Sequence, residues 1–233
     1  MPDIKLIVTS DGSHSLLNEA LNETYHSVHG AIQESQHVFI NNGLCYLLEK
    51  HTPSVVSIFE VGFGTGLNAL LTVKAMLTEK VLVKYVSVEA FPIGEELWNS
   101  LNYTKVLGCE DAFAMLHRSP WEKVNKISEH IEFLKYQTAL QKVELKDHSF
   151  DLVFFDAFAP NKQPELWTIG VLQKVVDAMK LNGIFVTYCA KGQLKRDLKE
   201  LGLSVETLPG PPGKKEMVRA TKLQSLELPP TFS

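Results

Sequence analysis

The stretch that decides the fold is Val55–Leu71, which reads VVSIFEVGFGTGLNALL. Its first part is β-branched and apolar, glycines follow at 62, 64 and 66, and helix-forming residues come next. This order predicts a buried parallel strand, a tight turn and a helix whose first N–H groups face the strand end. Glycine permits positive φ and lets a ligand approach the backbone. A strand-helix turn that binds nothing is the alternative.

The residue before this turn separates two classes of ligand. A dinucleotide site has the pattern G-x-G-x-x-G and places a pyrophosphate on the helix N-terminus. Here Leu67 stands at the third glycine position, and Glu60 precedes the turn. A carboxylate repels a pyrophosphate and attracts a cation. The pattern therefore favours S-adenosylmethionine, with its sulfonium and ammonium groups, over NAD.

A second acid, Glu89, follows the strand predicted over 81–88. It lies roughly 20 residues beyond the glycine turn, where an acid at the end of the second strand holds the hydroxyls of an adenosine ribose. The alternative is an ordinary solvated carboxylate at a strand end. With both acids present, the sequence favours a nucleoside site.

Composition is that of a globular α/β protein. The chain has 233 residues, of which 45% are hydrophobic and 21% charged. It lacks both an apolar run long enough to span a membrane and a secretory signal, and its three cysteines are far apart. These features predict a cytoplasmic protein without disulfides. His26, His29 and His37 lack neighbouring ligands at metal-binding spacing, so we expect no metal site.

Charge is distributed unevenly along the chain. The formal net charge of −4 argues against non-specific coating of nucleic acid. Residues 184–233, however, carry eight Lys and Arg against five Asp and Glu. This locally basic part either meets phosphates or is an ordinary solvated surface.

Strands and helices alternate from residue 55 onward, which predicts a doubly wound, mainly parallel sheet. The strands after the first are expected at 81–89, 131–135, 150–155 and 183–189, with an antiparallel edge from 203–208 and 217–221. The helices are expected at 67–78, 92–103, 109–117, 121–127, 164–180 and 193–201. Residues 1–52 are interpreted as an N-terminal extension, with a hairpin at Asp11-Gly12 and helices over 30–40 and 44–50 separated at Asn42-Gly43. Residues 53–233 form the main domain.

The fourth strand of this series delivers DAFAPNKQPELW, residues 156–167, to the edge where ligands of such sheets bind. An amine attacks a methyl donor only when it is neutral. A carboxylate such as Asp156 can accept its N–H, orient the lone pair and stabilise the developing positive charge. Phe158 can exclude water or stack on a base. Alternatively, Asp156 only caps the next helix.

Several segments resemble one family. FEVGFGTGLNAL, VEAFPI, DLVFFDAFAPNKQPELWT and GPPGKKEMVRA resemble the methyltransferase component of MnmC-type tRNA-modifying enzymes. DGSHSL, YHSVHGAIQES and VFINNGL resemble the N-terminal region of its stand-alone, MnmD-type members. The resemblance implies a Rossmann-like class I S-adenosylmethionine-dependent methyltransferase fold. It also implies methylation of the aminomethyl nitrogen of 5-aminomethyl-(2-thio)uridine at the tRNA wobble position, giving the methylaminomethyl form. Fused relatives carry an FAD-dependent oxidase domain, so a separate oxidase would act upstream of this chain.

The resemblance also implies roles for individual residues. Those implied to bind the cofactor are Glu60, Gly62, Gly64, Gly66, Glu89, Gln137 and Asp156. Glu60 and the glycines would line the methionine part, Glu89 the ribose, and Gln137 the adenine, where relatives tend to have Asp. Asp156 and Phe158 would face the methyl group and the amine, and Lys214, Lys215 and Arg219 an RNA-facing rim. Glu34 either closes over the cofactor, orients the substrate amine or ties the extension to the core.

Two other functions fit the same residues. An acid beside a sulfonium also suits a small-molecule amine methyl- or aminopropyltransferase. A nucleoside- or RNA-binding module without catalysis is the third possibility, and the presence of Asp156 argues against it.

Overall fold

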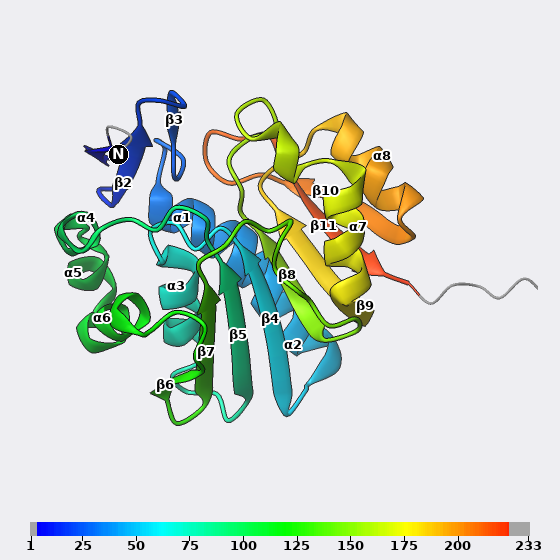
Figure 1. Ribbon diagram of the computed structural model, residues 1–233, viewed down its shortest axis with the longest axis horizontal. Coiled ribbons are helices and arrows are strands. Elements are labelled where there is room, and N and C mark those ends of the chain that lie inside the picture. The colour runs from blue at the N-terminus through cyan, green and yellow to red at the C-terminus, as the bar shows by residue number, and fades with distance from the viewer. Residues whose placement is uncertain (1–3, 224–233) are drawn as a thin grey trace, which may run out of the picture.

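The computed structural model describes residues 4–223 and contains an eight-stranded sheet beside a three-stranded one (Figure 1). The strand order of the large sheet is β10-β11-β9-β8-β4-β5-β7-β6. Its strands are β4 (Val55–Val61), β5 (Leu82–Val88), β6 (Asn125–Ser128), β7 (Ile131–Tyr136), β8 (Phe150–Phe155), β9 (Met179–Thr187), β10 (Leu203–Pro209) and β11 (Glu216–Lys222). The strands from β9 to β7 through β8, β4 and β5 are parallel, while β10 and β11 form an antiparallel edge. The predicted fold class is confirmed.

Strand β4 lies in the middle of this sheet and is buried on both faces. Ile58 belongs to a core cluster shared with α3 (Leu67–Ala75), and Phe59 to a second cluster shared with α7 (Ile169–Ala178) and α8 (Gly192–Glu200). Successive side chains of a strand point to opposite faces. The unbroken apolar run therefore reflects helices packed on both sides of the sheet.

Shorter helices complete the layers. They are α4 (Glu95–Ser100), α5 (Tyr103–Leu107) and α6 (Glu110–Arg118), grouped beside α3 in Figure 1, and the 3-10 helix η2 (Pro164–Leu166). The helix predicted over 92–103 is shorter, because Leu101 has an extended backbone that ends α4, and α5, which begins at Tyr103, was not predicted. The helix predicted over 164–180 begins at Ile169 and ends before β9.

The N-terminal segment begins with the predicted hairpin, formed by β1 (Ile4–Val8) and β2 (His14–Asn18), to which β3 (Glu23–Thr24) adds. The predicted break at Asn42-Gly43 is wrong. A continuous helical segment runs through α1 (Ala31–Ser35), the π-helix η1 (Gln36–Cys45) and α2 (Tyr46–His51).

Gly43 serves packing in this helix. A Cβ on Gly43 would lie 3.0 Å from Val186 Cγ2 and 3.2 Å from Phe154 Cε1, so its absence lets the helix approach the sheet closely. Phe39 and Leu44 from the same helix are buried in the core cluster that contains Ile58. The N-terminal segment therefore shares the hydrophobic core of the main sheet. The predicted ranges 1–52 and 53–233 extend at their outer ends beyond the described residues.

The helix predicted over 121–127 is also wrong. Glu122 has a φ of 60° and donates its backbone N–H to the Lys135 carbonyl oxygen. The following residues become β6, the antiparallel partner of β7 at the edge of the sheet. Pairing with β7 prevails over the local helical pattern. No helix within residues 4–223 is long and apolar enough to cross a membrane.

Candidate active site

A cavity of 1210 Å³ opens at the carboxyl ends of the parallel strands. Figure 1 shows the N-terminal sheet on the same side of the molecule as these strand ends. Residues that follow β4, β5, β7 and β8 line it, together with the N-terminal segment and the loop between β10 and β11. This is the edge where open α/β sheets bind their ligands.

The glycine turn between β4 and α3 forms the floor of the cavity. Gly62, Gly64 and Gly66 have φ values of 90°, 50° and 75°. Residues with a Cβ rarely adopt positive φ values. A Cβ on Gly62 would lie 2.7 Å from the Asp156 carbonyl oxygen, and one on Gly64 would lie 3.3 Å from Tyr25 Cδ1. These two glycines therefore keep the turn close to both neighbouring segments.

Glu89 lies at the end of β5 and is held by backbone groups. Its Oε2 accepts the Gly64 N–H at 3.0 Å, and its Oε1 accepts the Phe91 N–H at 2.8 Å. Burial raises the pKa of Glu89, and these hydrogen bonds oppose the rise. The carboxylate is thus fixed beside the glycine turn, facing the cavity.

Asp156 follows β8 and lines the cavity beside the turn. Its backbone N–H bonds to the Val61 carbonyl oxygen at 3.0 Å, and its Oδ2 accepts Asn68 Nδ2 at 2.7 Å. Burial, followed by the charge of Glu34, raises the pKa of Asp156 to about 7. This carboxyl group therefore exchanges its proton near neutral pH, as a general base requires.

The loop after Asp156 is fixed by its own backbone. Phe158 accepts the Trp167 Nε1–H on its carbonyl oxygen at 2.8 Å, and its ring meets Tyr25 edge to face at 5.1 Å. Tyr188 donates its hydroxyl to the Ala157 carbonyl oxygen at 2.8 Å. These contacts form an aromatic wall beside Asp156, built from the residue that follows β9, this loop and the N-terminal segment.

An ion pair completes the wall. Glu34, on α1, accepts Lys214 Nζ at 2.6 Å through Oε1 and the Ser27 N–H at 2.7 Å through Oε2. Glu34 is 5% exposed. Both charged residues line the cavity that contains Asp156.

Known proteins match this architecture. Residues 114–223 match the model of a family described as S-adenosyl-L-methionine-dependent methyltransferase. The chain is therefore similar to this family over slightly less than half of its length, a stretch that includes Asp156 and the loop between β10 and β11. The "tRNA 5-methylaminomethyl-2-thiouridine biosynthesis bifunctional protein MnmC" of Burkholderia multivorans is 30% identical over 94% of this chain and 35% of its own length. Its counterpart in Nitrosospira multiformis is 28% identical over 88% of this chain and 35% of its own length.

A solved structure is also similar. MnmC2 from Aquifex aeolicus has a TM-score of 0.77 and 26% identity, covering 94% of this chain and 70% of its own. The chain spans 35% of the length of each of the two MnmC relatives.

The cavity fits S-adenosylmethionine, the cofactor of the family. Gly62 and Gly64 line the cavity without a side chain, and Glu89 presents a carboxylate suited to ribose hydroxyls. The Asn68 Oδ1 atom is buried with no hydrogen-bond partner in the described part of the chain, and Asn68 lines the same cavity. Gln137, the expected adenine contact, lines the cavity after β7.

Glu60 does not lie where the sequence placed it. It is fully buried, is not among the residues lining the cavity, and accepts the Ser87 hydroxyl at 2.7 Å. Burial raises the pKa of Glu60 to about 8. The expectation that it lines the methionine part of the cofactor is wrong, because in β4 the next residue, Val61, reaches the cavity instead.

Three other expected contacts also lie away from the cavity wall. Gly66 sits under the turn, where a Cβ would lie 2.8 Å from His117 Nε2. Lys215 is exposed beside Lys214 but does not line the cavity. Arg219 is 8% exposed and bonds Glu206 at 2.9 Å, so its assignment to an RNA-facing rim is wrong.

Tyr25, Asn68 and Tyr188 were missed by the sequence analysis. Asn68 lies in the first turn of α3, directly after the glycine turn, and a polar residue at that position could have been predicted to face the ligand. Both tyrosines lie in segments distant in sequence, with no local pattern that indicates a site. Across residues 4–223, no three or more His, Cys, Asp or Glu are grouped so that they could hold a metal ion.

Proposed function

We propose that this chain methylates the aminomethyl nitrogen of 5-aminomethyl-(2-thio)uridine at the wobble position of tRNA. The observation that carries the proposal is Asp156, a cavity carboxyl group with a pKa raised to about 7, which lies between the glycine turn and the aromatic side chains of Phe158 and Tyr188. The printed names of the MnmC relatives, which concern methylaminomethyl-thiouridine biosynthesis in tRNA, support the choice of substrate.

The residues of the cavity have separate roles in this proposal. Bound S-adenosylmethionine supplies an electrophilic methyl group. Gly62, Gly64 and Glu89 would hold it, and Gln137 would meet its adenine. Asp156 would accept an N–H of the substrate amine, orient its lone pair, and take the proton that the nitrogen loses. Phe158 and Tyr25 would exclude water from the reacting nitrogen.

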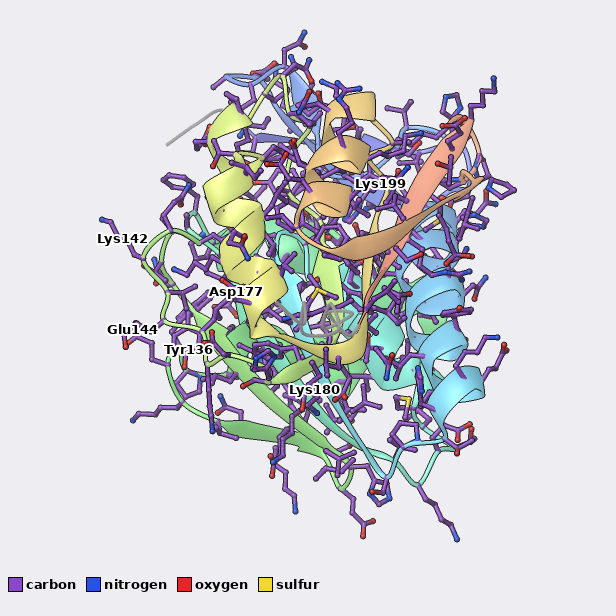
Figure 2. The ribbon with its side chains drawn as sticks, turned by 90° about the vertical axis from the view of Figure 1, so that its right-hand side faces the viewer. Tyr136, Lys142, Glu144, Asp177, Lys180 and Lys199 are labelled. Atoms are coloured by element: carbon purple, nitrogen blue, oxygen red, sulfur yellow. The ribbon has the colours of Figure 1, made fainter. Side chains whose placement is uncertain are left out.

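We place the approach of tRNA at the cavity mouth, where the exposed Lys215 adjoins the lining residue Lys214. The face covered by α7 and α8 is less suited, because charges of both signs are interspersed on it. Figure 2 shows these charges at Lys142, Glu144, Asp177, Lys180 and Lys199. A phosphate backbone prefers a surface of positive sign.

Because tRNA is the proposed substrate, we propose that the protein acts in the cytoplasm. A separate FAD-dependent oxidase acting upstream would expose the amine, in keeping with the word "bifunctional" in the names of the relatives.

The test uses purified protein, labelled S-adenosylmethionine and tRNA carrying 5-aminomethyl-2-thiouridine. Nucleoside mass analysis should detect the methylaminomethyl form, and the same tRNA with an unmodified wobble uridine is the control. Cofactor binding without this product would reject the proposal. Methylation of free polyamines without RNA would favour a small-molecule enzyme instead.

A further inference from the structure

The ammonium group of Lys214 is held inside the cavity between a carboxylate and an aromatic face. Its Nζ lies 2.6 Å from Glu34 Oε1 and 3.6 Å from the centroid of the Tyr188 ring. The Glu34 side chain is only 6% exposed. A buried carboxylate and the face of an aromatic ring are the two groups that proteins use to bind an alkylammonium ion.

This ammonium site adjoins the proposed methyl-acceptor site. The charges of Glu34 and Lys214 act on Asp156 in opposite directions: Glu34 raises its pKa and Lys214 lowers it. Tyr188 bonds the carbonyl oxygen of Ala157, the residue next to Asp156. The two carboxylates and the ring therefore face one part of the cavity.

Lys214 can leave this site without rearranging the fold. It stands in the loop between β10 and β11, which closes on itself through backbone bonds from Gly210 to Lys215 and from Lys214 to Pro211. The Lys214 side chain is 31% exposed, and within residues 4–223 Glu34 is its one hydrogen-bond acceptor. A rotation of the side chain would release Glu34.

We propose that Glu34 and Tyr188 form a subsite for a primary amine, which Lys214 occupies from within the chain and which the substrate takes over by exchange. The identity of that amine, the aminomethyl group of the modified uridine, rests on the proposed function. Exchange of one ammonium for another keeps Glu34 paired, so a buried carboxylate is not left without a counter-charge. A precursor with a carboxylate on the same nitrogen would be repelled by Glu34 and Asp156, so the subsite selects the free amine.

The exchange is tested by binding of nucleosides to the full chain saturated with S-adenosylhomocysteine. Calorimetry would compare 5-aminomethyluridine with the neutral 5-hydroxymethyluridine. In Lys214→Met, the affinity for the aminomethyl nucleoside should rise about tenfold, which corresponds to about 1.4 kcal/mol, because no internal ammonium competes. In Glu34→Gln it should fall about tenfold. The neutral nucleoside should respond to neither change.

Lys199→Met is the matched control, since Lys199 is exposed on α8, outside the residues that line the cavity. It should leave both affinities unchanged. Unchanged or weaker binding of the aminomethyl nucleoside to Lys214→Met would overturn the exchange.

A second measurement separates the subsite from the identity of the substrate. Propylammonium should raise the Tm of Lys214→Ala more than that of the parent protein, and propanol should not. If propylammonium stabilises this variant while the nucleoside fails to bind, the amine subsite stands and the proposed substrate is wrong. If propylammonium gives no such stabilisation, the subsite is wrong, whatever the protein does to tRNA.

Discussion

Asp156→Asn separates the charge of the proposed base from its shape. Asp156 accepts one hydrogen bond from Asn68 Nδ2 at 2.7 Å, and an asparagine oxygen can accept the same bond. The loop should therefore keep its conformation. Loss of the base should lower kcat by about 10²–10⁴-fold. The affinity for S-adenosylmethionine should fall much less, by about tenfold at most, because the glycine turn and Glu89 remain and only the attraction of one carboxylate is lost.

The same substitution should stabilise the protein above neutral pH. The folded pKa of Asp156, about 7, lies above the model value of 3.8. The folded state therefore binds this proton more tightly, and stability from the protonated group is lost as the pH rises from about 4 to 7. A shift of about three units limits the effect to about 4 kcal/mol. Because Asp156 is partly open to the cavity, we expect about 1–2 kcal/mol, or a Tm higher by about 2–8 °C at pH 8.

The assay is a pH–rate profile on tRNA carrying the aminomethyl group, with thermal unfolding followed in parallel. Turnover of the unsubstituted protein should rise with pH as Asp156 ionises, around its pKa of about 7. Turnover of Asp156→Asn should be low and should not show this rise. Asp177→Asn, an exposed carboxylate on α7, is the control. Turnover of Asp156→Asn within threefold of the parent would refute the assigned role. An equally large loss of cofactor binding would show that the carboxylate only builds the cofactor site.

Three further changes test the architecture around the site. Gly62→Ala should weaken cofactor binding at least tenfold by calorimetry, because its Cβ would lie 2.7 Å from a backbone oxygen at a φ of 90°. Gly170→Ala is the control, because its Cβ would meet nothing within 4 Å and it does not line the cavity; equal effects of the two changes would contradict this reason. Lys162→Met removes hydrogen bonds at 2.8 and 3.1 Å to carbonyl oxygens of the N-terminal segment. Limited proteolysis should therefore cleave that segment faster, with little change in Tm. An unchanged cleavage rate would show that these bonds do not hold the segment in place. Deletion of residues 1–52 should abolish cooperative unfolding, because it removes buried core side chains, and a folded truncated protein would indicate a separable extension.

The site residues that could be predicted from the sequence are those that directly follow a predicted strand. The glycine turn, Glu89 and Asp156 each follow a strand, and parallel strands bring their carboxyl ends to one edge. The position of Glu60 was misjudged because strand parity, not spacing from the glycines, decides which side chain faces a cavity. Arg219 was misjudged for the same reason: on β11 it points to Glu206 on β10 and stacks 3.5 Å from the centroid of Tyr46.

The pairs that close the cavity could not be predicted from a single sequence. Lys214 and Glu34 are 180 residues apart, and nothing near either one indicates the other. Their meeting depends on how the β10–β11 loop and the N-terminal helix pack on the same sheet edge. Tyr25 and Phe158 also come together only through tertiary packing, because they lie in two segments that are far apart in the sequence.

The charge balance of the cavity links cofactor binding to the readiness of the base. Burial raises the pKa of Asp156 and of Glu89, so the ionised form of each carboxyl group is disfavoured by its surroundings. A cation placed between them favours both ionised forms, and by linkage their ionisation strengthens its binding. A larger fraction of Asp156 would thus be ionised, and ready to accept a proton, when the methyl donor is in place. Glu34, already neutralised by Lys214, would remain the group that recognises the arriving amine.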